Sequence, residues 1–191
     1  MSLEHYGNRT NLRVVIEEYN RWFPMQYYFR SMMPKEKRVR IADLGAGIVS
    51  TIGRLNGRHQ IRVKASDILQ PEYAKILYKK RITLLTPMEY QDMQALTYTD
   101  NSFDIVHCVN ALDHLKNVAK AISEMKRICK VGGWVYLRHH PDQRTNYGGH
   151  HMWDAKMDCF IRGKKSVSIS EFTTVQDGDF IISRWQKNGL Q

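Results

Sequence analysis

Residues 39–47 read Val-Arg-Ile-Ala-Asp-Leu-Gly-Ala-Gly, and they constrain the fold of this chain more than any other segment. The apolar run predicts a buried strand, and the two glycines spaced by one residue predict a tight turn at its end. Such a turn brings backbone N–H groups close to a ligand, because its second glycine has no side chain to block the approach. The segment therefore predicts a strand whose end binds a ligand.

The acid of this segment, Asp43, restricts the ligand further. It lies two residues before the first glycine, at the mouth of the turn. A carboxylate there would repel the pyrophosphate of a nicotinamide dinucleotide, whereas S-adenosylmethionine (SAM) has an ammonium, a sulfonium and no phosphate. The dinucleotide fingerprint G-x-G-x-x-G would also need its third small residue at Ser50. Since the segment alone leaves both cofactors open, the choice depends on the rest of the chain.

Composition bounds the class of protein. The chain of 191 residues is predicted to form one domain, and its 42% hydrophobic and 25% charged residues are ordinary for a soluble protein. It has no apolar run of the roughly 20 residues that span a membrane, and its first residues lack the apolar core of a signal peptide. The three widely spaced cysteines show no zinc-ligand spacing, which predicts reduced thiols. We therefore expect a cytoplasmic protein without a membrane partner.

The net charge of +10 has two interpretations. A strongly basic protein can bind a polyanion such as RNA. Alternatively the surface is generally basic, which we favour because the positive residues are dispersed, acids lie between them and no run of five like charges occurs. RNA thus stays open as a less favoured partner.

Strand and helix patterns alternate after residue 38. The predicted strands are 39–44, 61–66, 82–85, 103–109 and 134–138, and the predicted helices are 50–56, 71–80 and 117–129. This alternation predicts an α/β fold with a Rossmann-like, doubly wound, mostly parallel sheet that binds ligands at the carboxyl ends of its strands. Segments 166–170 and 180–185 flank a turn signal at 176–179, which predicts a closing antiparallel hairpin. A nicotinamide domain ends with a parallel strand instead.

Residues 1–38 form a predicted N-terminal segment ahead of the domain 39–191. Aromatic residues crowd this segment, and Pro24 interrupts any single helix there. Two interpretations remain open. The segment is either a lid whose aromatic rings shield a sulfonium by cation–π contact, or a helix packed on the sheet.

From about residue 39 to residue 133, the chain resembles class I SAM-dependent methyltransferases of the small-substrate type. The resemblance implies an enzyme that binds SAM and releases S-adenosylhomocysteine. It implies that the turn Gly45-Ala46-Gly47 holds the methionine moiety and that Asp43 orients its ammonium. The family often has a third glycine where this chain has Val49.

The resemblance implies further cofactor contacts along the chain. Asp67, followed by Ile68, ends the second predicted strand, where a carboxylate accepts hydrogen bonds from both ribose hydroxyls. The alternative for Asp67 is an N-cap of the next helix. Asp92 would accept from the adenine amine, while the N–H of Met93 would reach the adenine ring. Asn110 follows the fourth predicted strand, where backbone groups of the family contact the cofactor.

Methyl transfer to a hydroxyl needs a group that removes its proton, and histidine suits this role with its ordinary pKa of about 6.5. His139 and His140 follow the fifth predicted strand, and His114 follows the fourth, so each is a candidate general base. His114 is equally compatible with a surface helix. The histidines and nearby acids have two other interpretations, a divalent metal site or polar loop residues. We predict no metal, because no pair has helical ligand spacing.

Residues 148–154 are similar to a glycine, histidine and tryptophan segment of methyltransferases from bacterial saccharide clusters. Trp153 is either a platform for a sugar or a core residue. We therefore predict methyl transfer to a small molecule or saccharide, at oxygen. The alternatives are an RNA methyltransferase and a non-catalytic SAM-binding domain. Residues 110–113 argue against methylation of base amino groups, since they read Asn-Ala-Leu-Asp and not Asn-Pro-Pro-Tyr.

Overall fold

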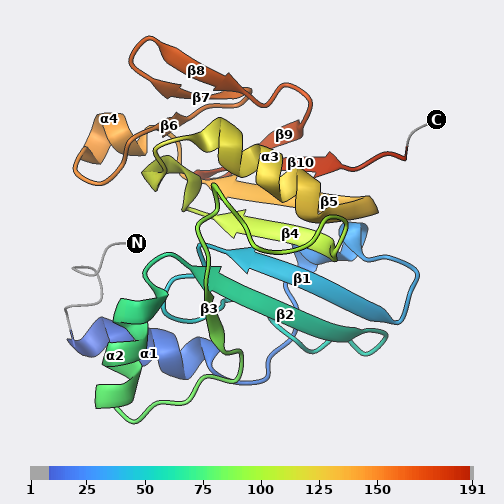
Figure 1. Ribbon diagram of the computed structural model, residues 1–191, viewed down its shortest axis with the longest axis vertical. Helices are drawn as coiled ribbons and strands as arrows, with labels where there is room; N and C mark the ends of the chain where they lie inside the picture. Colours follow the sequence, from blue (N-terminus) through green and yellow to red (C-terminus); the bar gives the residue numbers. More distant parts are fainter. Residues whose placement is uncertain (1–8, 190–191) are drawn as a thin grey trace.

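The computed structural model describes residues 9–189, and in this range a large sheet of seven strands has a small sheet of three beside it (Figure 1). The large sheet has the spatial order β3 (Met88–Tyr90), β2 (Gln60–Asp67), β1 (Arg38–Leu44), β4 (Phe103–Val109), β5 (Cys129–His139), β10 (Phe180–Gln186) and β9 (Thr173–Asp177). Strands β3, β2, β1, β4 and β5 run parallel to one another, while β10 is antiparallel to both β5 and β9. The predicted Rossmann-like sheet, closed by an antiparallel hairpin, is confirmed.

The remaining elements surround this sheet. They are the helices α1 (Arg9–Tyr19), α2 (Gln70–Lys79), α3 (Val118–Ile128) and α4 (Gln143–Tyr147), the 3₁₀ helices η1 (Tyr27–Met32) and η2 (Leu112–His114), and the small-sheet strands β6 (Asp154–Ala155), β7 (Cys159–Arg162) and β8 (Lys165–Ser168). Of the helices in the described range, none has the length and apolar character needed to cross a membrane.

Helix α3 covers one face of the sheet, in front of β4 and β5 in Figure 1. The side chain of Asn117 caps it by accepting a hydrogen bond from the Lys120 N–H (3.0 Å). Its buried residues recur at helical spacing and pack on the sheet. The opposite face packs against Phe29 and Met32 of η1. Because both faces are covered, β4 is buried along nearly its whole length.

The segment predicted as a helix, residues 50–56, is irregular instead. The N–H of Leu55 donates to the carbonyl of Phe23 (3.0 Å). In a helix this N–H would instead donate to the carbonyl four residues before it. Gly53 lies so close to Pro24 that a Cβ on Gly53 would stand 2.1 Å from the Pro24 oxygen. The β-branched residues of the segment also disfavour a helix. Tertiary contacts therefore hold this connection in an extended path.

Two other predicted elements were wrong. The third strand is β3 rather than residues 82–85, where Ile82 and Leu84 pack beside α1 and α2 instead. Segment 166–170 lies in β8 and the loop after it, and the strand that pairs with β10 is β9. The predicted turn at 176–179 is confirmed, since it connects these two strands. A strand leaves a weak signal in the local sequence when it is short or when other parts of the chain decide its pairing.

The aromatic N-terminal segment packs on the sheet over part of its length. Phe29 is fully buried, and the ring of Tyr28 stacks on that of Tyr136 with centroids 4.8 Å apart. Trp22 and Tyr27 are exposed. Packing on the sheet thus holds for Tyr28 and Phe29, and the lid stays a prediction that concerns Trp22 and Tyr27.

Candidate functional site

The carboxyl ends of β1, β2, β4 and β5 meet at one edge of the sheet, on the left in Figure 1. The strand register places Leu44 beside both Ser66 and Cys108, and it places Val109 beside Arg138. The residues that follow these strands therefore converge, including those predicted to bind a cofactor.

The glycine turn at this edge has the backbone that its sequence predicts. Gly45 and Gly47 have φ values of 67° and 69°, in the left-handed region that favours glycine. The N–H of Ala46 donates to the carbonyl of Ser66 (3.1 Å). A Cβ on Gly45 would lie 2.4 Å from the Cβ of Ala111. The turn is thus fastened to β2 and lies directly against the loop after β4.

Asp43 is buried, and both of its carboxylate oxygens have partners inside the protein. The Ser50 hydroxyl donates to Oδ2 (2.6 Å), and Nδ1 of His107 lies 2.9 Å from Oδ1. The His107 ring is nearly parallel to the ring of Tyr136, with centroids 5.4 Å apart. Asp43 therefore ties the glycine turn to β4. Sequence reasoning missed the partners, although a histidine within the apolar strand at 103–109 was a usable signal.

Asp67 joins the glycine turn to the end of β2. Its Oδ2 accepts from the Gly47 N–H (3.0 Å), and its Oδ1 accepts from the Leu69 N–H (2.8 Å). Helix α2 has Leu69 at its N-cap, so Asp67 is not the N-cap residue. Asp67 is partly buried, and the neighbouring side chain of Ile68 is 46% exposed. A carboxylate with accessible lone pairs thus stands beside the turn.

Asp92 and Met93 follow β3. Asp92 uses Oδ1 to accept from the Gln94 N–H (2.8 Å), which fixes the local turn. The Met93 side chain is buried, with its sulfur 3.9 Å from that of Cys108. Its methyl carbon would be 3.2 Å from a Cβ placed on Gly45. Met93 therefore forms an apolar wall next to the turn.

Asn110 links the loops after β4 and β5. It has a φ of 49°, a left-handed conformation that asparagine tolerates better than most residues. Its N–H donates to the Arg138 carbonyl (2.9 Å), and its Oδ1 accepts from the His140 N–H (3.1 Å). Asn110 thus sets the position of His140 at this edge.

The three histidines predicted as bases lie in different environments. Burial lowers the pKa of His139 to about 4, and its ring packs edge-on against Phe160. His140 donates from Nδ1 to the Asp179 carbonyl (3.1 Å). His114 donates from Nδ1 to the His150 carbonyl (3.2 Å), and burial lowers its pKa. The hydrogen bonds of His114 and His140 leave the lone pair of each on Nε2.

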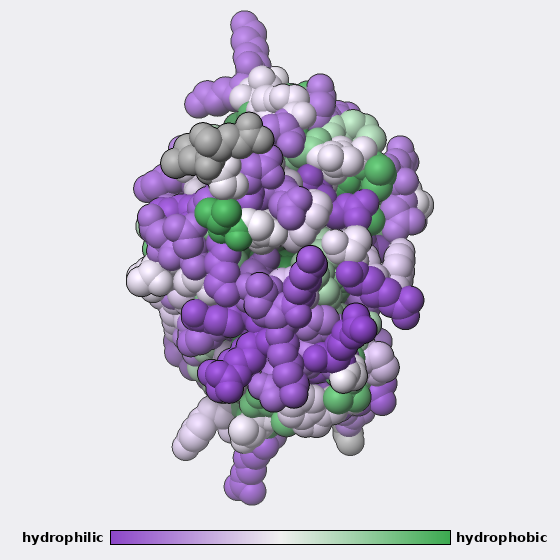
Figure 2. Space-filling model, turned by 90° about the vertical axis from the view of Figure 1, so that its right-hand side faces the viewer, coloured by the Kyte–Doolittle hydropathy of each residue, from purple (hydrophilic) through white to green (hydrophobic). Residues whose placement is uncertain are grey.

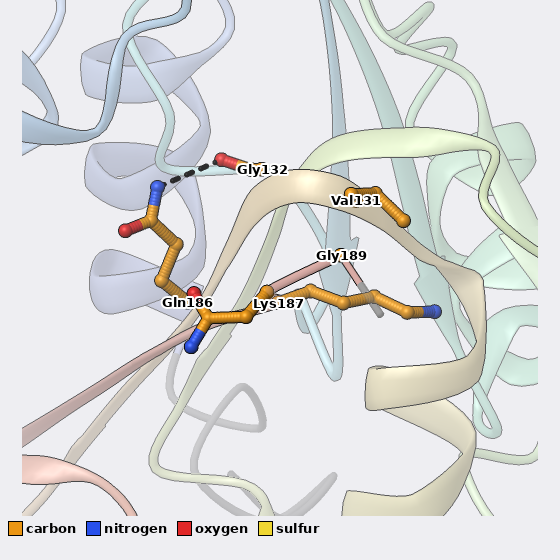
Figure 3. Close-up of a pocket in the computed structure, with 6 residues that line it drawn as sticks. Val131, Gly132, Gln186, Lys187 and Gly189 are labelled. Atoms are coloured by element: carbon orange, nitrogen blue, oxygen red, sulfur yellow. Dashed lines mark hydrogen bonds between the residues drawn. The ribbon is translucent and has the colours of Figure 1, made fainter. Parts of the chain in front are cut away.

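A surface hollow of about 620 Å³ lies elsewhere, where β5 begins and β10 ends (Figure 3). Gln186 donates there to the Gly132 carbonyl (3.0 Å), and Lys187 and Gly189 lie beside it. Figure 2 views the same side of the molecule and shows mainly hydrophilic side chains with small, separated apolar patches. The hollow thus lies at the edge opposite the glycine turn.

The residues at the glycine-turn edge fit SAM. The ribose hydroxyls, the adenine amine and the ammonium of SAM are all hydrogen-bond donors. Asp67 and Asp92 provide acceptors after neighbouring strands. Met93 offers apolar contact. The sheet order β3-β2-β1-β4-β5-β10-β9, with a glycine turn and carboxylates at the carboxyl ends of the parallel strands, is typical of the class of SAM-dependent methyltransferases.

Comparison with known proteins places the chain within that class. The family described as a methyltransferase domain matches residues 42–137, half of the chain, and the protein belongs to it. A solved protein of Methanococcus maripaludis, proposed to be a SAM-dependent methyltransferase, has the same fold with a TM-score of 0.54. It is 12% identical, and the alignment covers 94% of this chain and 84% of the other.

Curated relatives match over a shorter stretch. The ajmaline N-methyltransferase of Rauvolfia serpentina is 26% identical over 111 residues, which are 56% of this chain and 38% of the relative. The 27-O-demethylrifamycin SV methyltransferase of Amycolatopsis mediterranei is 26% identical over 109 residues, which are 56% of this chain and 40% of the relative. The chain thus spans about two fifths of the length of these two relatives.

Proposed function

We propose that this protein is a cytoplasmic enzyme that binds SAM and transfers its methyl group to a hydroxyl of a small molecule or saccharide. The observation that carries the proposal is the bond between the Asp67 carboxylate and the Gly47 N–H at the shared edge of β1 and β2. It makes the turn and the carboxylate one unit, with Met93 beside it.

Each residue at this edge has a role in the proposal. The turn Gly45-Ala46-Gly47 holds the methionine moiety, and Asp43 orients its ammonium. Asp67 accepts hydrogen bonds from the ribose hydroxyls, and Ile68 lies next to the ribose. Asp92 and Met93 bind the adenine, and the backbone near Asn110 contacts the cofactor.

Activation of the acceptor completes the proposed reaction. SAM supplies a methyl group on a positively charged sulfur and leaves as S-adenosylhomocysteine. The acceptor oxygen bonds to the methyl carbon as the carbon–sulfur bond breaks, with its electron pair staying on sulfur. The hydroxyl proton passes to a histidine. His114 and His140 fit this role better than His139, because a group with a pKa near 4 holds a proton weakly at neutral pH.

The proposal names oxygen as the atom that receives the methyl group. One curated relative is named an N-methyltransferase and another is named for an O-demethyl substrate, so the relatives include both kinds of name. The net charge of +10 supports RNA as a second candidate acceptor. RNA binding would fall steeply with salt, because it releases counterions, whereas binding of a neutral saccharide would not.

A screen of SAM consumption tests the proposed acceptor. The protein is incubated with SAM and, in separate reactions, with nucleotide sugars, small hydroxylated metabolites, amines and RNA. We expect S-adenosylhomocysteine to form with a hydroxylated compound, and His114→Gln or His140→Gln to slow that reaction. Product formed only with amines or only with RNA contradicts the proposal. Turnover that is unchanged in both histidine variants excludes a base among these two side chains.

A further inference from the structure

Three ionisable side chains with no role in the proposed cofactor contacts gather beyond the end of β4. Asp113 and His114 belong to η2, and His151 lies in the loop before β6. One potential ligand atom from each side chain lies within 4.8 Å of the other two. The group combines one carboxylate with two imidazoles, a donor set that suits divalent cations such as Zn²⁺, Co²⁺ and Mn²⁺.

Backbone bonds hold the two segments of this cluster together. The N–H groups of Met152 and Trp153 both donate to the Asp113 carbonyl (2.7 and 3.2 Å). The indole Nε1 of Trp153 donates to the Leu115 carbonyl (2.8 Å), and the ring is buried. The ligand atoms are therefore presented from a fixed frame, which reduces the ordering needed when a cation binds. Trp153 is a core residue of this frame rather than an exposed platform.

The hydrogen bonds of the histidines suit metal coordination. His114 donates from Nδ1 to the His150 carbonyl (3.2 Å), so its Nε2 has a lone pair. Imidazoles that bind metals commonly donate their second N–H to a carbonyl or carboxylate in this way. Nε2 of His114 lies 3.8 Å from Oδ2 of Asp113, and Nδ1 of His151 is hydrogen-bonded to the same oxygen.

The carboxylate of Asp113 supplies a second observation at this cluster. The residue is 3% exposed, and among the described residues its buried Oδ1 has no hydrogen-bond partner. A buried carboxylate oxygen without a partner costs free energy that a bound cation would recover. Asp113 thus has one oxygen bonded to His151 and one oxygen without a partner, and it lies beside the Nε2 lone pair of His114.

We propose that Asp113, His114 and His151 bind one divalent transition-series cation through a carboxylate oxygen and two ring nitrogens. Three protein ligands leave a coordination position open, as in catalytic rather than structural sites. The side chains of His114 and His151 are 24% and 26% exposed, so both imidazoles are accessible from solvent. This proposal replaces the sequence prediction of no metal, which considered only ligands at helical spacing.

The cation has a use at this edge of the sheet. A hydroxyl bound to it would have a lowered pKa, which supplies the activation that a histidine base would otherwise give. His114 would then be a ligand, which leaves His140 as the candidate base. This use rests on the proposed methyl transfer, whereas cation binding itself does not.

Titration of the metal-free protein with Co²⁺ tests the site. We expect one Co²⁺ per chain, ligand-field bands in the visible range and displacement by Zn²⁺. Asp113→Asn and His151→Gln should each weaken Co²⁺ binding by at least about tenfold, in line with the loss of a ligand. His59→Gln is the matched control, because His59 precedes β2 at the opposite edge, within reach of the Pro34 carbonyl, and should bind Co²⁺ as the wild type does.

The outcomes separate this proposal from the proposed function. Folded wild-type protein that binds neither Co²⁺ nor Zn²⁺ overturns the cation site, and so does binding that both variants retain. His151→Gln alters a partly exposed side chain, so the test holds even if Asp113→Asn fails to fold. S-adenosylhomocysteine is titrated in parallel. Cation binding without S-adenosylhomocysteine binding leaves the site standing and contradicts methyl transfer, and the reverse result contradicts only the site.

Discussion

Two separate features of the structure require a glycine at position 45. Its φ of 67° strains any residue with a Cβ, and that Cβ would lie 2.4 Å from the Cβ of Ala111. Gly45→Ala should therefore lower the free energy of unfolding by about 1–3 kcal/mol, measured by urea denaturation. Gly57→Ala is the control, because a Cβ there meets nothing within 4 Å. Equal stability of the two variants would contradict the geometry of the turn.

The cysteines differ in reactivity because they differ in burial. Cys108 is fully buried, and burial raises the pKa of Cys129 to about 12. Only Cys159 is partly exposed. A disulfide reagent at mildly alkaline pH should therefore modify a single thiol quickly in the native protein, and all three thiols in denaturant. Cys159→Ser should abolish the fast phase, and a fast phase that survives in this variant would refute the assignment.

At the level of site residues, the sequence predicted positions better than partners. Asp43 and Asp67 lie at the predicted edge, because each stands at the end of a strand with a clear local pattern, and Met93 lies there after the short strand β3. The contacts of Asp43 with Ser50 and His107 come from different parts of the chain, so no local spacing announces them. The same holds for the proposed cation site, whose side chains come from η2 and from the loop before β6.

At the level of elements, long periodic segments were predicted well and tertiary contacts decided the rest. The strand at 103–109 is present with its predicted bounds, and the helix predicted at 117–129 is present at Val118–Ile128. Residues 50–56 are long enough for a short helix, yet their backbone forms hydrogen bonds with the N-terminal segment instead. Strand β3 has only three residues, too few for a strand pattern to be recognised.

Gly53 tests this account of the irregular connection. A Cβ at this position would lie 2.1 Å from the Pro24 oxygen, which is backbone and yields little. We expect Gly53→Ala to cost about 1–3 kcal/mol of unfolding free energy and to speed hydrogen exchange at the Leu55 amide. A helix at 50–56 in solution would instead make Gly53→Ala neutral or stabilising.

At the scale of the whole molecule, the sheet brings distant segments to one edge. Asp67, Met93 and Asn110 belong to three successive strand-to-loop transitions, and only the order of the strands makes them neighbours. The alternation of strands and helices predicted this architecture. It did not predict which loops would meet beyond β4, because that depends on packing between the region after β5 and η2.

Calorimetric titration of the folded protein with S-adenosylhomocysteine tests the central claim, a SAM site at the glycine turn. We expect one molecule bound per chain, with affinity at least about tenfold lower in Asp67→Ala, which loses charge-assisted hydrogen bonds, and a smaller loss in Asp67→Asn. Asp177→Ala, which removes an exposed carboxylate at the end of β9, should bind as the wild type does. Absence of binding to the folded wild type, or equal affinity in Asp67→Ala and Asp177→Ala, would contradict the site.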